Sequence, residues 1–451
     1  MAAPCAPRND PKPALDLIKY RIYPYHDRQA VYGHTTQQRT TMDLEWSEKD
    51  RAFRDEVRGF LDEKLTPDLR AAGRLMTSVY ADHEASMAWQ AILHERGWAA
   101  PAWPVEYGGC DWTLTQHYIF SRESTLAGAP SLSPMGIRMV AHAIIKFGTA
   151  EQKAFFLPRI LTGEVFFCQG YSEPESGSDL ASLQMAAVDD GDDLILTGSK
   201  IWTTHATEAN WMFALVRTSR LERKQQGITF ILLEMDSPGI EVHPLVMTSG
   251  EEVQNQVFFD SVRVPKANVL GRIDDGWTVA KYLLEFERGG GATAPALQVM
   301  AEEIATAATQ QTGPHGGPLI DDPAFARKLA DVRIRTEVLE ILEFRTLAVV
   351  AEGGNPGTAS SMLKVLSTEL SQLITELALE TAGPRGRVYQ PHATRPGGPV
   401  TEYEPPADGY VSGEPWQAVA PLRYFNDRAG SIYAGSNEIQ RNILAKAELG
   451  L

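Results

Sequence analysis

The chain has 451 residues, which is too long for one ordinary domain and predicts about three domains. Its 42 Lys and Arg residues stand against 58 Asp and Glu residues, and this net charge of −16 argues against nucleic acid as a partner. Three cysteines, no apolar run of about 18 residues and no secretory signal pattern lead us to expect a soluble cytoplasmic protein without disulfides or a metal site.

Residues 1–41 show no sustained periodicity, and we expect them to be a poorly structured extension or a misassigned start. The segment 42–164 is predicted to be an N-terminal helical domain. Ser47 and Asp50 form a capping pattern, and apolar residues then follow at helical spacing before Pro67 ends the first helix. These apolar residues are Phe53, Val57, Phe60, Leu61 and Leu65.

Residues 165–275 change to short runs of β-branched and aromatic residues separated by turn residues. This texture predicts a middle β domain. The runs with the clearest strand character are 194–197, 211–217, 228–234 and 257–264.

The segment 276–451 returns to helical spacing and is predicted to be a C-terminal helical bundle. We expect helices from Trp277, from Asp322-Pro323, over 359–382 and over 437–449. A Pro-rich and Gly-rich insertion at 386–420 is predicted to be an ordered excursion or a lid. Gly289–Gly291 predict either a break in the helix or a close approach of the backbone to a ligand.

Two segments of the β domain carry polar groups of unusual density. Residues 168–179 combine hydroxyls, small residues and turn formers, a mixture that by itself usually marks only a turn. Lys200–Thr204 then places a tryptophan beside two threonines. A flat heteroaromatic cofactor needs this combination, because its ring requires a π face and its edge requires hydrogen-bond partners.

These segments and a third one resemble the acyl-CoA dehydrogenase family. The shared patterns are S-E-P-x-x-G-S-D at 172–179, K-x-W-T-T at 200–204 and the segment 432–442. The segments 103–109 and 255–260 are similar to a bacterial branch that includes pimeloyl-CoA dehydrogenase subunits. The resemblance runs from Met42 to Leu451. It implies an α+β multidomain fold with an N-terminal α-helical domain, a middle β-barrel or sandwich and a C-terminal four-helix bundle.

The resemblance implies that FAD is the cofactor. It places the flavin edge near Gln169, Tyr171 and Ser172, the indole of Trp202 against the ring and Thr204 near the reactive nitrogen. Ser178 would lie nearer the FAD pyrophosphate or the pantetheine arm of the substrate, and Ser436 and Glu438 would contact FAD from the C-terminal helix.

The same resemblance directs attention to the catalytic base. Many family members carry the carboxylate directly after the Tyr of the C-terminal signature, where this chain has Ala434. Other members supply it from an L-[DE]-x-E-R pattern, which matches Leu284–Arg288 and assigns the base to Glu287. The alternative is that Glu287 is a solvated helix residue in an ordinary ion pair. The backbone N–H of Ala434 would be one donor to the thioester oxygen.

The family pattern also implies residues that touch the acyl-CoA substrate: Ser178, Glu285, Arg288, Tyr433 and Gly435. An electron-transfer flavoprotein is the implied electron acceptor. The implied assembly is a homo-tetramer or homo-dimer, or a heteromer with a second acyl-CoA dehydrogenase-like subunit. His205, beside the cofactor strand, is expected to pack or to supply a polar edge rather than to act as an acid or base.

The chain departs from the family at two places that hold the FAD pyrophosphate. The stretch 312–325 lacks a recognisable R-x-x-F-G motif, and 380–384 replaces a Q-x-x-G-G turn. These departures favour cofactor binding shared with another chain. Two alternatives therefore stay open: a non-catalytic or FAD-sharing subunit, and a flavin oxidase or monooxygenase on the same fold.

Overall fold

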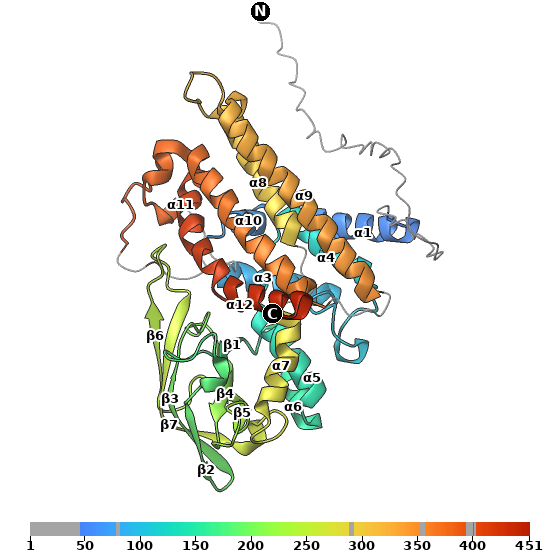
Figure 1. Cartoon of the computed structure of the whole chain (residues 1–451), viewed down its shortest axis with the longest axis vertical. Coiled ribbons are helices and arrows are strands. Elements are labelled where there is room, and N and C mark those ends of the chain that lie inside the picture. Colours follow the sequence, from blue (N-terminus) through green and yellow to red (C-terminus); the bar gives the residue numbers. More distant parts are fainter. Residues whose placement is uncertain (1–45, 78–81, 288–292, 352–356, 394–399, 401–402) are drawn as a thin grey trace, which may run out of the picture. The chain divides into compact units, whose positions relative to one another are not determined.

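The computed structural model describes residues 46–451 except 78–81, 288–292, 352–356, 394–399 and 401–402 (Figure 1). The extension expected at 1–41 lies outside the described residues, as do the side chains of 285–287. Within the described ranges, none of the helices combines the length and the apolar character that a membrane crossing requires.

The N-terminal part of the described chain is helical. Its first helix begins where the capping pattern predicts, because the Ser47 hydroxyl accepts a hydrogen bond from the Asp50 backbone N–H at 3.1 Å. The apolar residues predicted for this helix are all buried. The elements are α1 (Glu48–Lys64), α2 (Pro67–Arg74), α3 (His83–Arg96), α4 (Leu114–Ala127), the π-helix η2 (Met135–Val140), α5 (Ala141–Phe147) and α6 (Ala150–Thr162).

A seven-stranded sheet follows, with the order β1-β4-β2-β3-β7-β6 and with β5 paired to β4. Strand β4 is buried on both faces, since Phe213 and Leu215 join the core shared with the N-terminal helices while Met212 and Ala214 join the core on the other face. The strands are β1 (Phe167–Gly170), β2 (Ala186–Asp190), β3 (Asp193–Lys200), β4 (Trp211–Arg217), β5 (Ile228–Glu234), β6 (Ile240–Leu245) and β7 (Gln254–Pro265).

The C-terminal part is again helical. Helix α7 packs against β5, η2 and α5, and Figure 1 shows it beside α5 and α6, whereas α8, α9 and α10 surround a separate core of the bundle. The Asp322 carboxylate caps α9 by accepting the N–H groups of Ala324 and Phe325, both at 3.0 Å. The helices are α7 (Gly276–Glu287), α8 (Thr293–Gln310), α9 (Pro323–Ala351), α10 (Ala359–Ala382), α11 (Pro415–Asp427) and α12 (Asn437–Leu444).

The excursion predicted over 386–420 ends earlier than expected, because helix α11 begins at Pro415. Proline at this first turn is compatible with a helix, since the N–H that it lacks would have no intrahelical partner. A second proline, Pro421, lies inside α11, and because proline usually ends a helix, the sequence pattern did not predict this one. Gly289–Gly291 lie outside the described residues; the helices on either side end at Glu287 and begin at Thr293.

Candidate functional site

The turn after β1 is organised by a buried ion pair. The Lys200 ammonium lies 2.8 Å from Glu173 Oε1 and donates to the Tyr171 carbonyl at 3.2 Å. The Glu173 carboxylate also accepts the backbone N–H groups of Gln184 at 2.6 Å and Met185 at 2.9 Å. The two predicted motifs, at 172–179 and 200–204, are therefore joined through their charged residues.

Burial dominates the electrostatics of this pair. The Lys200 side chain is fully buried and that of Glu173 is 8% exposed. Burial lowers the pKa of Lys200 to about 8, and the charge of Glu173 opposes this shift. A buried ion pair contributes little to net stability, but removal of one partner leaves a costly charge, so the pair fixes the shape of the turn. Sequence reasoning quoted both residues inside motifs and assigned neither of them a role.

The predicted flavin-edge residues start at β1. Gly170 packs so closely on β4 that an added Cβ would lie 2.5 Å from Met212 Sδ, so a larger residue there would displace the Met212 side chain. The ring of Tyr171 is buried edge-on against Phe213 and Phe230. Gln169 is half-buried in β1, and the Ser172 carbonyl accepts the Ile201 N–H at 2.9 Å. This backbone bond ties the turn to the start of the second motif.

The segment from Trp202 to His205 has an irregular backbone. Trp202 and His205 have φ of 59° and 58°, values that are rare for residues other than glycine. Residues at the start of β7 and just before it hold this conformation, because the N–H groups of Thr203 and His205 donate to the carbonyls of Asn255 at 3.0 Å and Val253 at 2.9 Å. The result leaves the Trp202 indole 59% exposed.

Thr204 and His205 are buried beside this tryptophan. The Thr204 hydroxyl accepts a hydrogen bond from the Gln254 side-chain amide, with 3.0 Å between Nε2 and Oγ1. His205 lies 3.4 Å from the carboxylate of Glu208 through Nδ1. Burial and this local pairing fit the packing role expected for His205.

Ser178 and Asp179 form the exposed end of the first motif. Asp179 pairs with Lys224 of the β4–β5 connection at 2.6 Å, and the buried Ser176 hydroxyl donates to the Asp179 carbonyl at 2.9 Å. Ser178 is exposed at the tip of this loop. The loop is therefore anchored at its base and open to a ligand at its end.

The C-terminal signature forms a second exposed turn. Ala434 and Gly435 have φ of 52° and 79°, so two successive residues adopt the left-handed conformation. The amide of buried Gln440 donates to both of their carbonyls, at 3.3 and 3.2 Å. Tyr433 is 45% exposed.

The turn leads directly into α12. The Ser436 hydroxyl accepts the Ile439 N–H at 3.3 Å and caps the helix. Glu438, in the first turn, has its pKa lowered by the backbone N–H at this helix end and then by Ser436. Both predicted cofactor residues therefore sit at the helix N-terminus, where backbone donors attract negatively charged groups.

The proposed base lies at the end of α7. Val279, Ala280 and Leu283 bury one face of this helix in the core shared with the sheet. Glu285 and Glu287 belong to the last turn of α7, but their side chains lie outside the described residues, and so does Arg288. The geometry of these three side chains stays a prediction.

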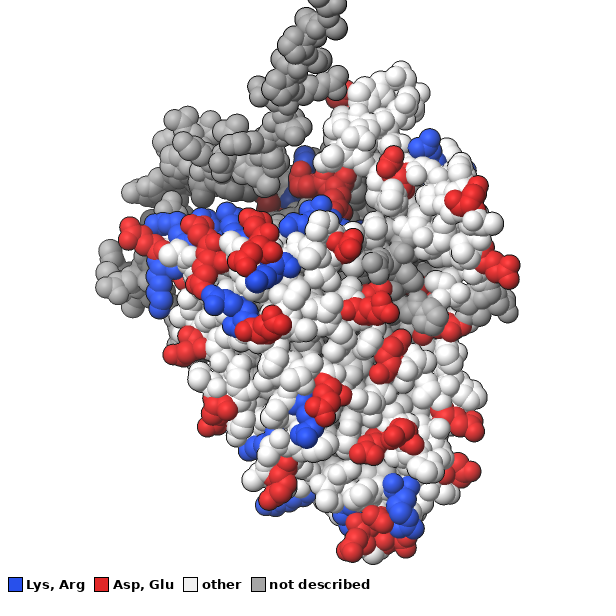
Figure 2. Space-filling model, turned by 180° about the vertical axis from the view of Figure 1, so that it is seen from behind, with Lys and Arg blue, Asp and Glu red and all other residues white. Residues whose placement is uncertain are grey.

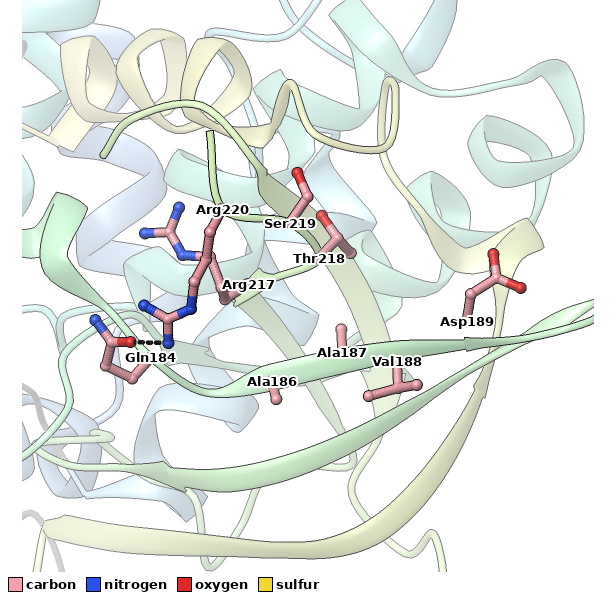
Figure 3. Close-up of a pocket in the computed structure, with 9 residues that line it drawn as sticks. All are labelled: Gln184, Ala186, Ala187, Val188, Asp189, Arg217, Thr218, Ser219 and Arg220. Atoms are coloured by element: carbon pink, nitrogen blue, oxygen red, sulfur yellow. Dashed lines mark hydrogen bonds between the residues drawn. The ribbon is translucent and has the colours of Figure 1, made fainter. Parts of the chain in front are cut away.

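A hollow of about 310 Å³ lies in the β domain between β2 and the end of β4 (Figure 3). Arg217 lines it, but its guanidinium donates to backbone carbonyls, including those of Ala181 and Gln226 at 2.8 Å. Arg220 is hydrogen-bonded to Gln184, as Figure 3 shows. None of the predicted site residues lines this hollow. The hydrogen bonds of the Arg217 guanidinium to backbone carbonyls show that Arg217 has a structural role.

The surface charge is mixed on one face of the molecule. On the face seen in Figure 2, the described Lys and Arg side chains stand among acidic ones and form no continuous basic area. Among the described residues, no group of three or more His, Cys, Asp or Glu side chains is placed to hold a metal ion.

The described residues fit FAD. An exposed indole at Trp202 offers a π face, while the turn at Ser172 and the turn at Ala434 offer backbone donors and acceptors. The N-terminus of α12 offers further donors, beginning with Ser436. A flavin ring and its diphosphate need these groups, and no glycine-rich nucleotide loop is required.

Comparison with family models identifies three consecutive matches. Residues 47–164 match the acyl-CoA dehydrogenase N-terminal domain, 168–262 the middle domain and 274–449 the C-terminal domain. These matches and the observed architecture confirm the predicted fold class and the resemblance stated from the motifs.

Individual proteins show the same likeness. Acyl-CoA dehydrogenase IpdE1 of Mycobacterium tuberculosis is 33% identical over 406 residues, covering 88% of this chain and 97% of that protein. The solved structure titled Tcur3481-Tcur3483 steroid ACAD has a TM-score of 0.75 and 26% identity, covering 91% of this chain and 99% of that one. The ChsE4-ChsE5 complex from Mycobacterium tuberculosis has a TM-score of 0.73 and 28% identity, with coverage of 91% and 99%.

Proposed function

Because this chain belongs to the acyl-CoA dehydrogenase family and is an oxidoreductase acting on acyl-CoA, we propose that it converts an acyl-CoA thioester to the 2-enoyl-CoA. The observation that carries the proposal is the conjunction of an exposed indole at Trp202 with a strained turn at Ala434 and a helix that ends in Glu287. Each of these elements matches one requirement of the reaction.

FAD is the proposed cofactor, and it would accept the hydrogen of the substrate β carbon together with its electron pair. The flavin edge would bind at Gln169, Tyr171 and Ser172, and the ring would lie against Trp202 with Thr204 at its edge. Ser178 would bind the FAD pyrophosphate or the pantetheine arm of the substrate, and Ser436 and Glu438 would bind FAD. The two hydrogen bonds between Thr203 and Asn255 support this placement, because they fix the backbone conformation of the segment without a ligand.

Glu287 is the proposed base, which takes the α proton of the thioester. A carboxylate near a flavin and an acyl chain loses solvent, so its pKa rises toward the value that a general base needs. The packing of α7 against the sheet supports the assignment, because a helix buried along one face carries its last turn in a fixed direction.

The backbone N–H of Ala434 is the proposed donor to the thioester oxygen. Negative charge grows on this oxygen as the α proton leaves, and a fixed donor stabilises it. Backbone residues with positive φ occur at functional sites because the strain orients a group that a relaxed turn would not present. Ala434 has φ 52°, and the Gln440 amide donates to the carbonyls of Ala434 and Gly435.

The substrate would contact Ser178, Glu285, Arg288, Tyr433 and Gly435. One of the similar structures is titled a steroid ACAD, and on that likeness we propose a bulky acyl group rather than a short straight chain.

An electron-transfer flavoprotein is the proposed electron acceptor. The chain would act as an oligomer, either of identical subunits or with a second acyl-CoA dehydrogenase-like subunit.

The experiment is an anaerobic titration of the FAD-loaded protein with acyl-CoAs of straight-chain, dicarboxylic and steroid-derived types, followed at the flavin absorption band. Loss of that band with one of them is the expected result. Steady peroxide formation in air without an added acceptor would instead indicate a flavin oxidase. Failure of every acyl-CoA to reduce the flavin would contradict the proposal.

A second candidate, an FAD-sharing subunit of a heteromer, is favoured by one observation. The connection from α8 to α9, which contains the turn bridged by Thr312 and Pro318, has no arginine between 312 and 325 to reach a diphosphate. The similar ChsE4-ChsE5 structure is itself a complex of two named chains. Weak FAD retention by the chain alone and tight retention after co-purification with a second subunit would support this candidate.

A further inference from the structure

A buried carboxylate joins three parts of the fold outside the residues assigned so far. Glu251, in the connection from β6 to β7, is fully buried and accepts hydrogen bonds from the Thr77 hydroxyl and the Asn426 amide. The Ser249 hydroxyl lies 2.7 Å from Glu251 Oε2 and 2.9 Å from Asn426 Oδ1. These four residues are called the Glu251 junction below.

The junction brings together distant segments of the sequence. Thr77 follows α2, Ser249 and Glu251 lie between β6 and β7, and Asn426 lies at the end of α11. The Asn426 amide also donates to the Thr77 carbonyl at 2.8 Å. One turn earlier on α11, Arg423 donates to the Met76 carbonyl at 2.8 Å. The C-terminal part of helix α11 is therefore hydrogen-bonded both to the segment after α2 and to the β6–β7 connection.

On the sheet side, the junction continues into the residues that hold the tryptophan segment. Glu251 is two residues before Val253, whose carbonyl accepts the His205 N–H at 2.9 Å. Asn255 binds Thr203 twice, since it accepts the Thr203 N–H through its carbonyl and donates to the Thr203 carbonyl through its side chain, each at 3.0 Å. A displacement of Glu251 would move these partners directly.

On the helical side, the junction continues into the turn at Ala434. The residues after Asn426 are bonded to their neighbours: Asp427 accepts from Ser371 at 3.0 Å, and the Ala429 carbonyl accepts the N–H groups of Ile432 at 2.8 Å and Tyr433 at 3.1 Å. The chain from Asn426 to Tyr433 thus has little freedom to rotate separately. The position of α11 sets the position of the turn.

We propose that Glu251 is a positioning residue that fixes the distance between the Trp202–Thr204 segment and the Ala434 backbone N–H. This inference rests on the proposed function, which assigns the two segments to opposite sides of one reaction. The sheet carries one segment and the helical bundle the other, so their spacing depends on contacts between these parts. A misplacement of about 1 Å between reacting groups lowers a rate by up to about a hundredfold.

The chemistry of the junction shows what a substitution of Glu251 changes. The Thr77 hydroxyl, the Ser249 hydroxyl and the Asn426 amide all donate to the Glu251 carboxylate in the structure. A glutamine at this position has the same shape but replaces one acceptor oxygen by NH₂, so at least one of these hydrogen bonds must reverse or break. Glu251→Gln therefore perturbs the junction while it preserves side-chain volume.

The test compares Glu251→Gln with the neighbouring control Glu252→Gln, which changes the same groups one residue away and outside the junction. In the FAD-loaded proteins, the flavin reduction rate at saturating acyl-CoA should fall about tenfold in Glu251→Gln and change less than about twofold in Glu252→Gln. The Michaelis constant should change less than the rate. Equal rates in the two variants, or a lower melting temperature with an unchanged rate, would overturn the proposal.

A milder variant keeps the test decisive if Glu251→Gln does not fold. Ser249→Ala removes one donor without creating an unpaired charge, and it should lower the reduction rate in the same direction, by about threefold. An unchanged rate in Ser249→Ala would then overturn the positioning role.

Amide hydrogen exchange separates this inference from the proposed function. The N–H groups of Thr203, His205, Ile432 and Tyr433 are hydrogen-bonded in the structure, and in Glu251→Gln they should exchange faster together, by about tenfold, relative to Glu252→Gln. If no acyl-CoA reduces the wild-type flavin, the proposed function fails and the exchange result alone decides the junction. Faster exchange in only one of the two segments would overturn the inference.

Discussion

The turn at 172–176 and the turn at 432–436 both carry residues proposed for the site, and different forces hold them. The first rests on the buried charges of Glu173 and Lys200, which are 8% and 0% exposed. The second is open, with Ile432 69% and Tyr433 45% exposed, and its shape depends on backbone strain and on the helix that precedes it. A turn held by buried charge keeps its shape within its own domain, whereas an exposed turn needs its neighbours.

The largest expected effect comes from removal of Lys200, the cation of the buried pair, which tests whether buried charge holds the first turn. Lys200→Met leaves the Glu173 carboxylate buried without its charge partner, and the free energy of unfolding should fall by about 3–5 kcal/mol. Urea denaturation followed by circular dichroism measures this change. Lys224→Met is the matched control, because it removes a lysine from the exposed pair with Asp179 and should lower stability by at most about 1 kcal/mol.

The double variant Glu173→Gln with Lys200→Met completes the test. The N–H groups of Gln184 and Met185 bond to different oxygens of Glu173, so the side-chain amide that Glu173→Gln introduces still accepts one of them and leaves no buried charge. We expect the double variant to be more stable than Lys200→Met alone. Equal losses in the two variants would contradict the view that an uncompensated charge causes the damage.

Glu343 is a carboxylate bound by neutral donors, and the pH dependence of stability that it causes can be compared with the effect of the Glu173–Lys200 ion pair. Glu343 on α9 accepts the N–H groups of Thr293 at 2.9 Å and Ala294 at 3.0 Å, and Tyr118 donates to it at 3.3 Å. Burial raises the pKa of Glu343 to about 7, and the two backbone N–H groups oppose this shift. The native state therefore binds the Glu343 proton more tightly than the unfolded state does.

The sign of the expected effect follows from this difference. The contribution of Glu343 to stability is present below the unfolded pKa of about 4.5 and is lost as the pH rises through about 7. The stability of the wild type relative to Glu343→Gln should fall by at most about 3 kcal/mol over this range. Urea unfolding at a series of pH values measures it, with Glu106→Gln at an exposed position as the control. A pH-independent difference would refute the raised pKa.

The smallest expected effects concern the exposed turn. Gly435→Ala places a Cβ at φ 79° and should destabilise the protein by about 1 kcal/mol. Ala434→Gly relieves strain at φ 52° and should be neutral or stabilising, while it keeps the backbone N–H that the reaction requires. Thermal unfolding of both variants gives the comparison. A more stable Gly435→Ala protein would argue against the left-handed turn.

The sequence predicted the elements with a clear apolar pattern along the chain. Strands β4 and β5 have the predicted bounds, 211–217 and 228–234, because continuous apolar runs between turn residues mark buried strands. Strands β1, β2 and β6 were missed. They are short, and β6 contains Pro244, so local pattern carries little information about them.

The candidate site was predictable only in its motifs. Trp202 and Ala434 could be singled out from family patterns, but their positive φ values depend on partners elsewhere in the chain. The Glu173–Lys200 bond joins residues that are 27 apart, and the bond from Thr77 to Glu251 spans 174 positions. Periodicity and spacing report on neighbours in the sequence, so neither contact has a local signal.

The most direct test of the account is the rate of anaerobic flavin reduction in Glu287→Gln. The variant should bind FAD as the wild type does, and reduction by a substrate acyl-CoA should be slower by a factor of about 10²–10⁴, because the α proton no longer has a base. Glu302→Gln on the exposed side of α8 serves as the control and should reduce normally. Wild-type reduction rates in Glu287→Gln would contradict the assignment of the base.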